Sequence, residues 1–144
     1  MTSAIVGPMC AYTLFLFGIW ALLGYVRISG SLRGMIPTQY LRVGEGPLPP
    51  AKIVDVHHHF SNQFEVPMLF YLGCITTLAT QSVDRATVTL AWSFVGLRVV
   101  HTAIVLVKND PRIRVAPYVL STLAVWTMWA NLFRQVVWVS QGAP

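Results

Sequence analysis

Four long runs of apolar residues divide the chain, and each is as long as a helix that crosses a lipid bilayer. They cover residues 4–26, 60–80, 86–107 and 115–139. A membrane helix needs about 20 apolar residues to span the hydrocarbon core. The runs lack the strict alternation of apolar and polar positions that strands of a membrane barrel require. The pattern therefore predicts an all-α, integral membrane bundle of four helices, built as a single domain over residues 1–144.

The connections between these runs predict how the bundle is oriented. The first, residues 27–59, is a long loop rich in glycine and proline, and the other two are tight turns that make neighbouring helices antiparallel. Seven basic residues lie in or beside the first and third connections: Arg27, Arg33, Arg42, Lys52, Lys108, Arg112 and Arg114. Only Arg85 and Arg134 lie on the other side. Because positive loops stay in the cytoplasm, we expect loop 27–59 to be cytoplasmic and both termini to be non-cytoplasmic.

The composition supports a membrane protein and removes several other classes. The hydrophobic fraction is 55% and the charged fraction 10%, whereas soluble domains carry about 25% charged residues. The net charge of +5 comes from residues in the connections. We therefore expect contact with anionic membrane lipids and no nucleic-acid partner. Cys10 and Cys74 lie inside apolar runs, which is typical of small buried side chains rather than of a disulfide framework.

Polar residues at membrane depth form the candidate site. A charged side chain at the centre of a membrane helix costs about 2.5–3.5 kcal/mol on insertion scales, so such residues usually face the protein interior. His58, Asn62 and Glu65 follow one another at the i, i+4 and i+7 spacing of one helix face. Pro67 lacks an N–H group and predicts a bend just after them.

The third apolar run carries Arg98 and His101 three residues apart, again on one helix face. By their distance from the ends of the runs, both lie near the depth of Glu65. We therefore expect Glu65 to pair with Arg98 first and with His101 second. From the residues alone, such a pair serves helix packing as readily as it serves chemistry.

Two further features are open to a functional and a plain interpretation. Arg114 begins the fourth run at the cytoplasmic mouth of the polar zone, where the sequence alone favours a simple orienting charge. The consecutive histidines His57, His58 and His59 invite a metal site. Adjacent residues on a helix point about 100° apart, however, and cannot converge on one ion. We predict no metal site.

Short motifs in the second and third runs resemble a known family. Residues 62–67 read Asn-Gln-Phe-Glu-Val-Pro and resemble the Asn-x-x-Glu…Pro signature of the MAPEG proteins, the membrane-associated proteins in eicosanoid and glutathione metabolism. Residues 98–102 read Arg-Val-Val-His-Thr and resemble the Arg-x-x-His-Thr segment of the prostaglandin E synthase branch. Arg114 falls where that branch has its catalytic arginine. The resemblance extends over essentially the whole chain.

The resemblance implies a fold, a cofactor and roles for particular residues. It implies a homotrimer with active sites between subunits, open near the cytoplasmic face and binding glutathione. Asn62 and Glu65 would hold glutathione, Arg98 and His101 would shape the pocket, and Arg114 would stabilise the thiolate. A nearby guanidinium does lower the pKa of a thiol, and the thiolate is the nucleophile.

The sequence also departs from the family pattern. His58 stands where catalytic members have an arginine, Ser61 replaces a second arginine, and Val105 replaces a tyrosine that contacts glutathione. The chain thus resembles a divergent member of bacterial type, placed in an inner membrane. Two functions stay open. One is a glutathione-dependent transferase, peroxidase or isomerase acting on a lipophilic electrophile. The other is a non-catalytic subunit that binds a lipid, a hydrophobic ligand or a larger membrane complex; a proton path ranks third.

Overall fold

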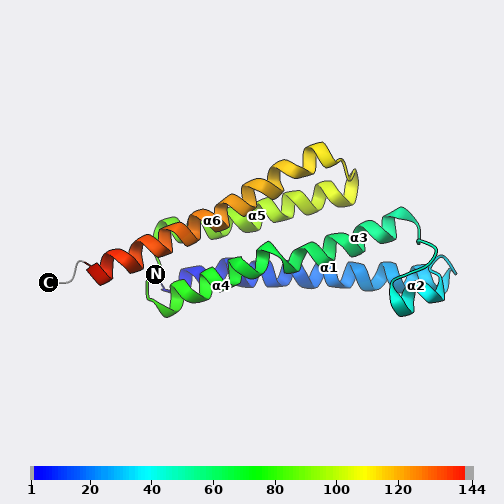
Figure 1. Cartoon of the computed structure of the whole chain (residues 1–144), viewed down its shortest axis with the longest axis horizontal. Helices are drawn as coiled ribbons and strands as arrows, with labels where there is room; N and C mark the ends of the chain where they lie inside the picture. Colours follow the sequence, from blue (N-terminus) through cyan, green and yellow to red (C-terminus); the bar gives the residue numbers. More distant parts are fainter. Residues whose placement is uncertain (1, 142–144) are drawn as a thin grey trace.

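The computed structural model describes residues 2–141 and is built of helices, with no strand in that range. In chain order the elements are η1 (Thr2–Ile5), α1 (Val6–Leu32), α2 (Thr38–Val43), α3 (Ala51–Ser61), η2 (Asn62–Phe64), α4 (Val66–Ala79), α5 (Arg85–Val107) and α6 (Pro111–Gln141). Figure 1 shows α3 and α4 following one another beside α1, with the α5–α6 pair beyond them. The predicted all-α class is confirmed.

Within residues 2–141, two segments are long and apolar enough to cross a membrane. They are Ser3–Leu32, which contains α1, and Arg85–Val107, which is α5. Helix α6 is longer, at 31 residues, but its sequence is more polar. Helix α4 has 14 residues and by itself reaches about 21 Å at 1.5 Å per residue. The four membrane crossings remain a prediction.

The second apolar run does not form one continuous helix. Helix α3 ends at Ser61, a 3-10 turn follows, and Glu65 adopts φ −94° and ψ −97° before α4 begins. Pro67 lies in the first turn of α4, where its missing N–H group costs no helical hydrogen bond. The predicted bend near Pro67 is thus confirmed, as a complete interruption.

Residues 27–59, expected as a loop, contain a substantial amount of helix. Helix α1 continues to Leu32, α2 follows, and α3 occupies Ala51–Ser61. Helix α3 buries Ile53, Val56 and His59, which recur at the i, i+3, i+6 spacing of one helix face. A search for apolar runs does not detect this buried face, because the histidines of α3 interrupt the apolar residues. The α3 helix therefore brings the polar side chain of His59 against Thr102 of α5.

An aromatic cluster lies where α1, α4 and α5 meet. The rings of Phe70 and Phe94 stack with their centroids 4.3 Å apart, and the Tyr12 ring lies 5.1 Å from Phe94. One turn farther along α4, Gly73 packs directly against Met128 of α6. Inside a membrane, helix association depends on such close packing and on hydrogen bonds. The bundle is therefore tightly packed around this aromatic cluster and Gly73, and more open at the end that holds the candidate site.

A polar clamp joins α5 and α6 at the end of the bundle opposite that site. Asp84 caps α5 by accepting a hydrogen bond from the Thr87 amide at 2.7 Å. Its second carboxylate oxygen accepts from the side-chain amides of Asn131 and Gln135, each at 3.0 Å. One carboxylate therefore fixes both the start of α5 and the position of α6 beside it.

Candidate functional site

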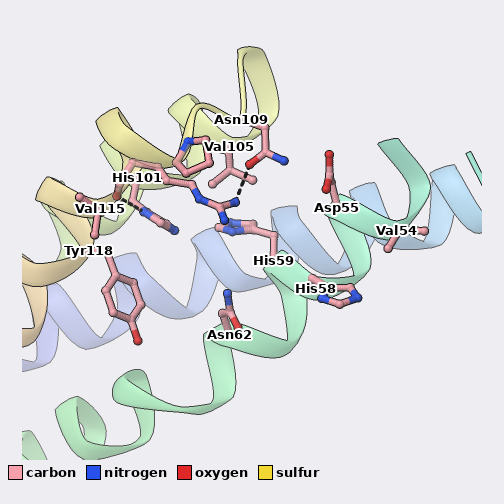
Figure 2. Close-up of a pocket in the computed structure, with 12 residues that line it drawn as sticks. Val54, Asp55, His58, His59, Asn62, His101, Val105, Asn109, Val115 and Tyr118 are labelled. Atoms are coloured by element: carbon pink, nitrogen blue, oxygen red, sulfur yellow. Dashed lines mark hydrogen bonds between the residues drawn. The ribbon is translucent and has the colours of Figure 1, made fainter. Parts of the chain in front are cut away.

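A cavity of about 530 Å³ separates α3 from the α5–α6 hairpin. It is lined by Val54, Asp55, His58, His59, Asn62, His101, Val105, Asn109, Pro111, Arg114, Val115 and Tyr118. Figure 2 shows the labelled side chains of α3 on one side and those of α5 and α6 on the other. The two walls come from segments about 50 residues apart, so only the tertiary fold assembles them.

Four of the six residues predicted for the site line this cavity. They are His58, Asn62, His101 and Arg114. Glu65 is exposed on the surface of the chain, because the break after Ser61 takes it off the helix face that Asn62 shares with α3. The expected i, i+4, i+7 face therefore ends at Asn62.

Arg114 is held in place by the turn before it. Its Nη1 donates to Asn109 Oδ1 at 2.5 Å, and its backbone carbonyl accepts from His101 Nδ1 at 2.9 Å. The turn itself is fixed by Asp110, whose carboxylate accepts from the Arg112 amide at 2.9 Å. Arg114 is half-buried, whereas Arg112 is exposed. A guanidinium borders the cavity with part of its donor capacity still free.

Arg98 lies behind the cavity and is completely buried. Its guanidinium carbon is 5.5 Å from the centroid of Phe94 and 5.1 Å from that of Tyr118. None of its three side-chain nitrogens has a hydrogen-bond partner among the described residues. The predicted pair with Glu65 is therefore not formed within the chain, and His101 bonds the Arg114 carbonyl instead. The buried cation thus contacts two aromatic rings, and the Glu65 carboxylate acts on it only through its electric field, without a hydrogen bond.

A chain of hydrogen bonds that sequence reasoning missed runs across the bundle to the cavity. Tyr12 donates to Gln63 Oε1 at 2.7 Å, and Gln63 Nε2 donates to the His59 carbonyl at 3.1 Å. His59 Nε2 lies 2.9 Å from Thr102 Oγ1. All four side chains are buried. The spacing of His59 from Ile53 and Val56 was the available signal for its buried position.

The electrostatics of the cavity favour a ligand with negative charge. Arg114 borders it and Arg98 lies behind it, while Asp55 is the one carboxylate among the residues that line it. A guanidinium with free donors pairs with carboxylates and thiolates through charge-assisted hydrogen bonds. Asn62, Asn109 and Tyr118 add neutral polar groups that suit a peptide-like molecule.

Comparison with known proteins connects this geometry to one family. A sequence model described as the MAPEG family matches residues 5–134, which is nearly the whole chain and includes every residue of the cavity. Searches of curated proteins and of solved structures each found no match. The family resemblance stated from residues 62–67 and 98–102 is thereby confirmed.

Proposed function

Because this chain belongs to the MAPEG family, we propose that it is a multi-pass membrane protein that binds glutathione in the cavity around Arg114. Its function would be to transfer the bound thiol to a lipophilic electrophile, or to reduce that electrophile with the thiol. The observation that carries the proposal is the position of Arg114, whose guanidinium borders a cavity large enough for a tripeptide. A guanidinium beside a thiol favours the thiolate, which is the reactive form.

The polar residues of the cavity suit the other groups of glutathione. Asn62 and Asn109 offer amide donors and acceptors to its peptide bonds. Asp55 offers a carboxylate to its ammonium group, whereas the family resemblance implied that Asn62 and Glu65 together hold glutathione. His58 lies at the exposed edge of the cavity, where catalytic relatives are expected to have an arginine. Glutathione, an anion, would thus contact fewer cationic side chains here than the family pattern predicts.

We further propose that the chain assembles as a homotrimer with four membrane crossings per subunit. The broken helix between Ser61 and Val66 leaves Glu65 on the surface of the chain, within the segment predicted to be the second membrane crossing. Backbone groups and carboxylates at that depth must be covered by protein or water. The face beside it carries an apolar groove of about 300 Å³ between Phe17 and Phe60. A neighbouring subunit would cover both the groove and the carboxylate.

A second function is supported by a different feature of the same cavity. Val105, buried at its wall, is apolar where the family pattern predicts a tyrosine that contacts glutathione. Losing that hydroxyl weakens recognition of a polar peptide and favours an apolar ligand. The alternative is therefore a non-catalytic membrane subunit that binds a lipid or hydrophobic ligand, alone or within a larger membrane complex.

Binding of glutathione to the purified protein tests the proposal. Isothermal titration in detergent or nanodiscs should detect glutathione binding, and Arg114→Ala should weaken it by about 1.5–3 kcal/mol, the range for a hydrogen bond to a charged group. Arg112→Ala is the matched control, because Arg112 is exposed and does not line the cavity. It should leave the affinity unchanged.

The titration, together with a turnover assay and an assay of co-purified lipid, separates the two functions. Turnover of a chromogenic aryl halide by the wild type, lost in Arg114→Ala, would identify an enzyme. Glutathione binding without turnover would leave a binding protein. If the wild type bound no glutathione but retained lipid through purification, the second function would replace the first.

A further inference from the structure

Asn109, in the turn that follows α5, has a left-handed backbone conformation although it is not glycine. Its φ is 46°, and Gln81 at φ 55° is the only other non-glycine residue with a positive φ among the described residues. Helices often end at a residue in this conformation, which is usually glycine and sometimes asparagine. The Asn109 N–H donates to the Ile104 carbonyl at 2.9 Å and so closes the end of α5. Glycine would suit this backbone better, so the asparagine side chain invites a functional explanation.

The side chain of Asn109 holds the guanidinium of Arg114. Its Oδ1 accepts a hydrogen bond from Arg114 Nη1 at 2.5 Å (Figure 2). Because a guanidinium can only donate, the amide atom that faces it must be the oxygen. A charged donor makes this one of the stronger kinds of hydrogen bond. Both residues line the same cavity, so the bond fixes a cation at the site itself.

Arg114 is thereby anchored at two points. Its backbone carbonyl accepts from His101 Nδ1 at 2.9 Å, and its guanidinium is held by Asn109. The carbonyl bond fixes the first turn of α6 but leaves the long side chain free to turn. An arginine at the rim of a cavity tends to extend its charged end into water. The hydrogen bond from Asn109 therefore decides whether the cation stays at the cavity.

We propose that Asn109 is a positioning residue for Arg114, which it holds against the thiol that binds in the cavity. Asn109 itself takes no part in the chemistry of the sulfur atom. The attraction between a guanidinium and a thiolate weakens as the two move apart. Release of Arg114 should therefore raise the pKa of the bound thiol toward the ~8.5 of a free one. This consequence rests on the proposed function, because it requires a bound thiol.

Exchange of Asn109 for glycine removes the amide and preserves the turn. Glycine adopts a positive φ without strain and keeps the N–H group that bonds the Ile104 carbonyl. Gln81→Gly is the matched control, because it makes the same kind of exchange at the other left-handed position. Gln81 is exposed and does not line the cavity. Thermal unfolding of both variants close to that of the wild type would show that the fold is intact.

The thiolate absorbance of bound glutathione is then measured across pH on the purified full-length protein. Asn109→Gly should reduce the thiolate fraction at neutral pH by roughly threefold to tenfold, as for a displaced catalytic cation. Gln81→Gly should leave it unchanged. In an Arg114→Ala background, Asn109→Gly should cause no further loss, because Asn109 acts through Arg114. An unchanged thiolate fraction in Asn109→Gly overturns the proposal. A loss of equal size in both backgrounds also overturns it, since that result means a purely structural role.

A measurement without glutathione separates this inference from the proposed function. A guanidinium is planar, and one held by a hydrogen bond turns slowly about its C–N bonds. Nitrogen NMR should therefore resolve Nη1 from Nη2 of Arg114 in the wild type and show one averaged signal in Asn109→Gly. Arg114→Ala identifies the signals. Averaging in the wild type overturns the proposal. If the wild type binds no glutathione, the proposed function fails, and the NMR comparison still decides whether Asn109 holds Arg114.

Discussion

Replacing the buried Arg98 by methionine should stabilise the ligand-free protein. The Arg98 side chain is fully buried, and its nitrogens have no hydrogen-bond partner among the described residues. A central arginine costs about 2.5–3.5 kcal/mol on insertion scales, and two aromatic contacts return about 1–2 kcal/mol in total. Methionine has similar length, fills the space between Phe94 and Tyr118, and carries no charge. The unfolding free energy should therefore rise by about 1–2 kcal/mol.

Reversible unfolding by a denaturing detergent in mixed micelles measures this change. Arg85→Met is the control, because Arg85 is exposed at the start of the same helix, and it should alter stability by less than about 0.5 kcal/mol. Arg98→Lys keeps the charge and should give no gain. A loss of stability in Arg98→Met would refute the reasoning. It would mean that the assembled protein supplies a carboxylate partner, with Glu65 the first candidate.

Two further predictions concern the framework around the site. Gly73→Ala should destabilise the protein by about 1 kcal/mol, the low end of overpacking, because the added methyl group displaces the terminal methyl of the flexible Met128 side chain and lies 3.2 Å from Trp129 Nε1. Gly96→Ala, in open space, should not destabilise it in the same unfolding assay. Although burial alone raises the pKa of Asp84, hydrogen bonds from α5 and α6 lower it below the usual 3.8. The stabilisation that these hydrogen bonds contribute is fully present above the pKa of Asp84 in the unfolded chain. It is lost as the pH falls through the lower pKa that Asp84 has in the folded protein. Thermal unfolding across acidic pH should show this loss, and Asp84→Asn should remove that pH dependence.

The pattern of apolar residues was sufficient to predict the class of this protein and most of its helices. Long apolar stretches form helices in a membrane whatever their neighbours, because the backbone must satisfy its own hydrogen bonds there. The interruption near Pro67 was also predictable, since the missing N–H group of proline is a local property. The short motifs at residues 62–67 and 98–102 were specific enough to identify the family.

Helix α3 was beyond the reach of the same reasoning. Its sequence between Ala51 and Ser61 mixes charges and histidines with a few apolar residues, so it reads as part of a polar loop. It is helical because Ile53 and Val56 find a surface to bury them in the fold. Packing, rather than local preference, decides such segments.

Only the tertiary structure decided which polar side chains meet. Helical spacing placed Glu65 with Asn62, but the 3-10 turn between α3 and α4 interrupts the helical periodicity and leaves Glu65 on the surface. The tertiary structure also places Arg98 beside two aromatic rings and His59 beside Thr102. The sequence determines the periodicity of each helix. The contacts between helices depend on how far each is rotated and where it breaks, and these are set by the packing of the whole bundle.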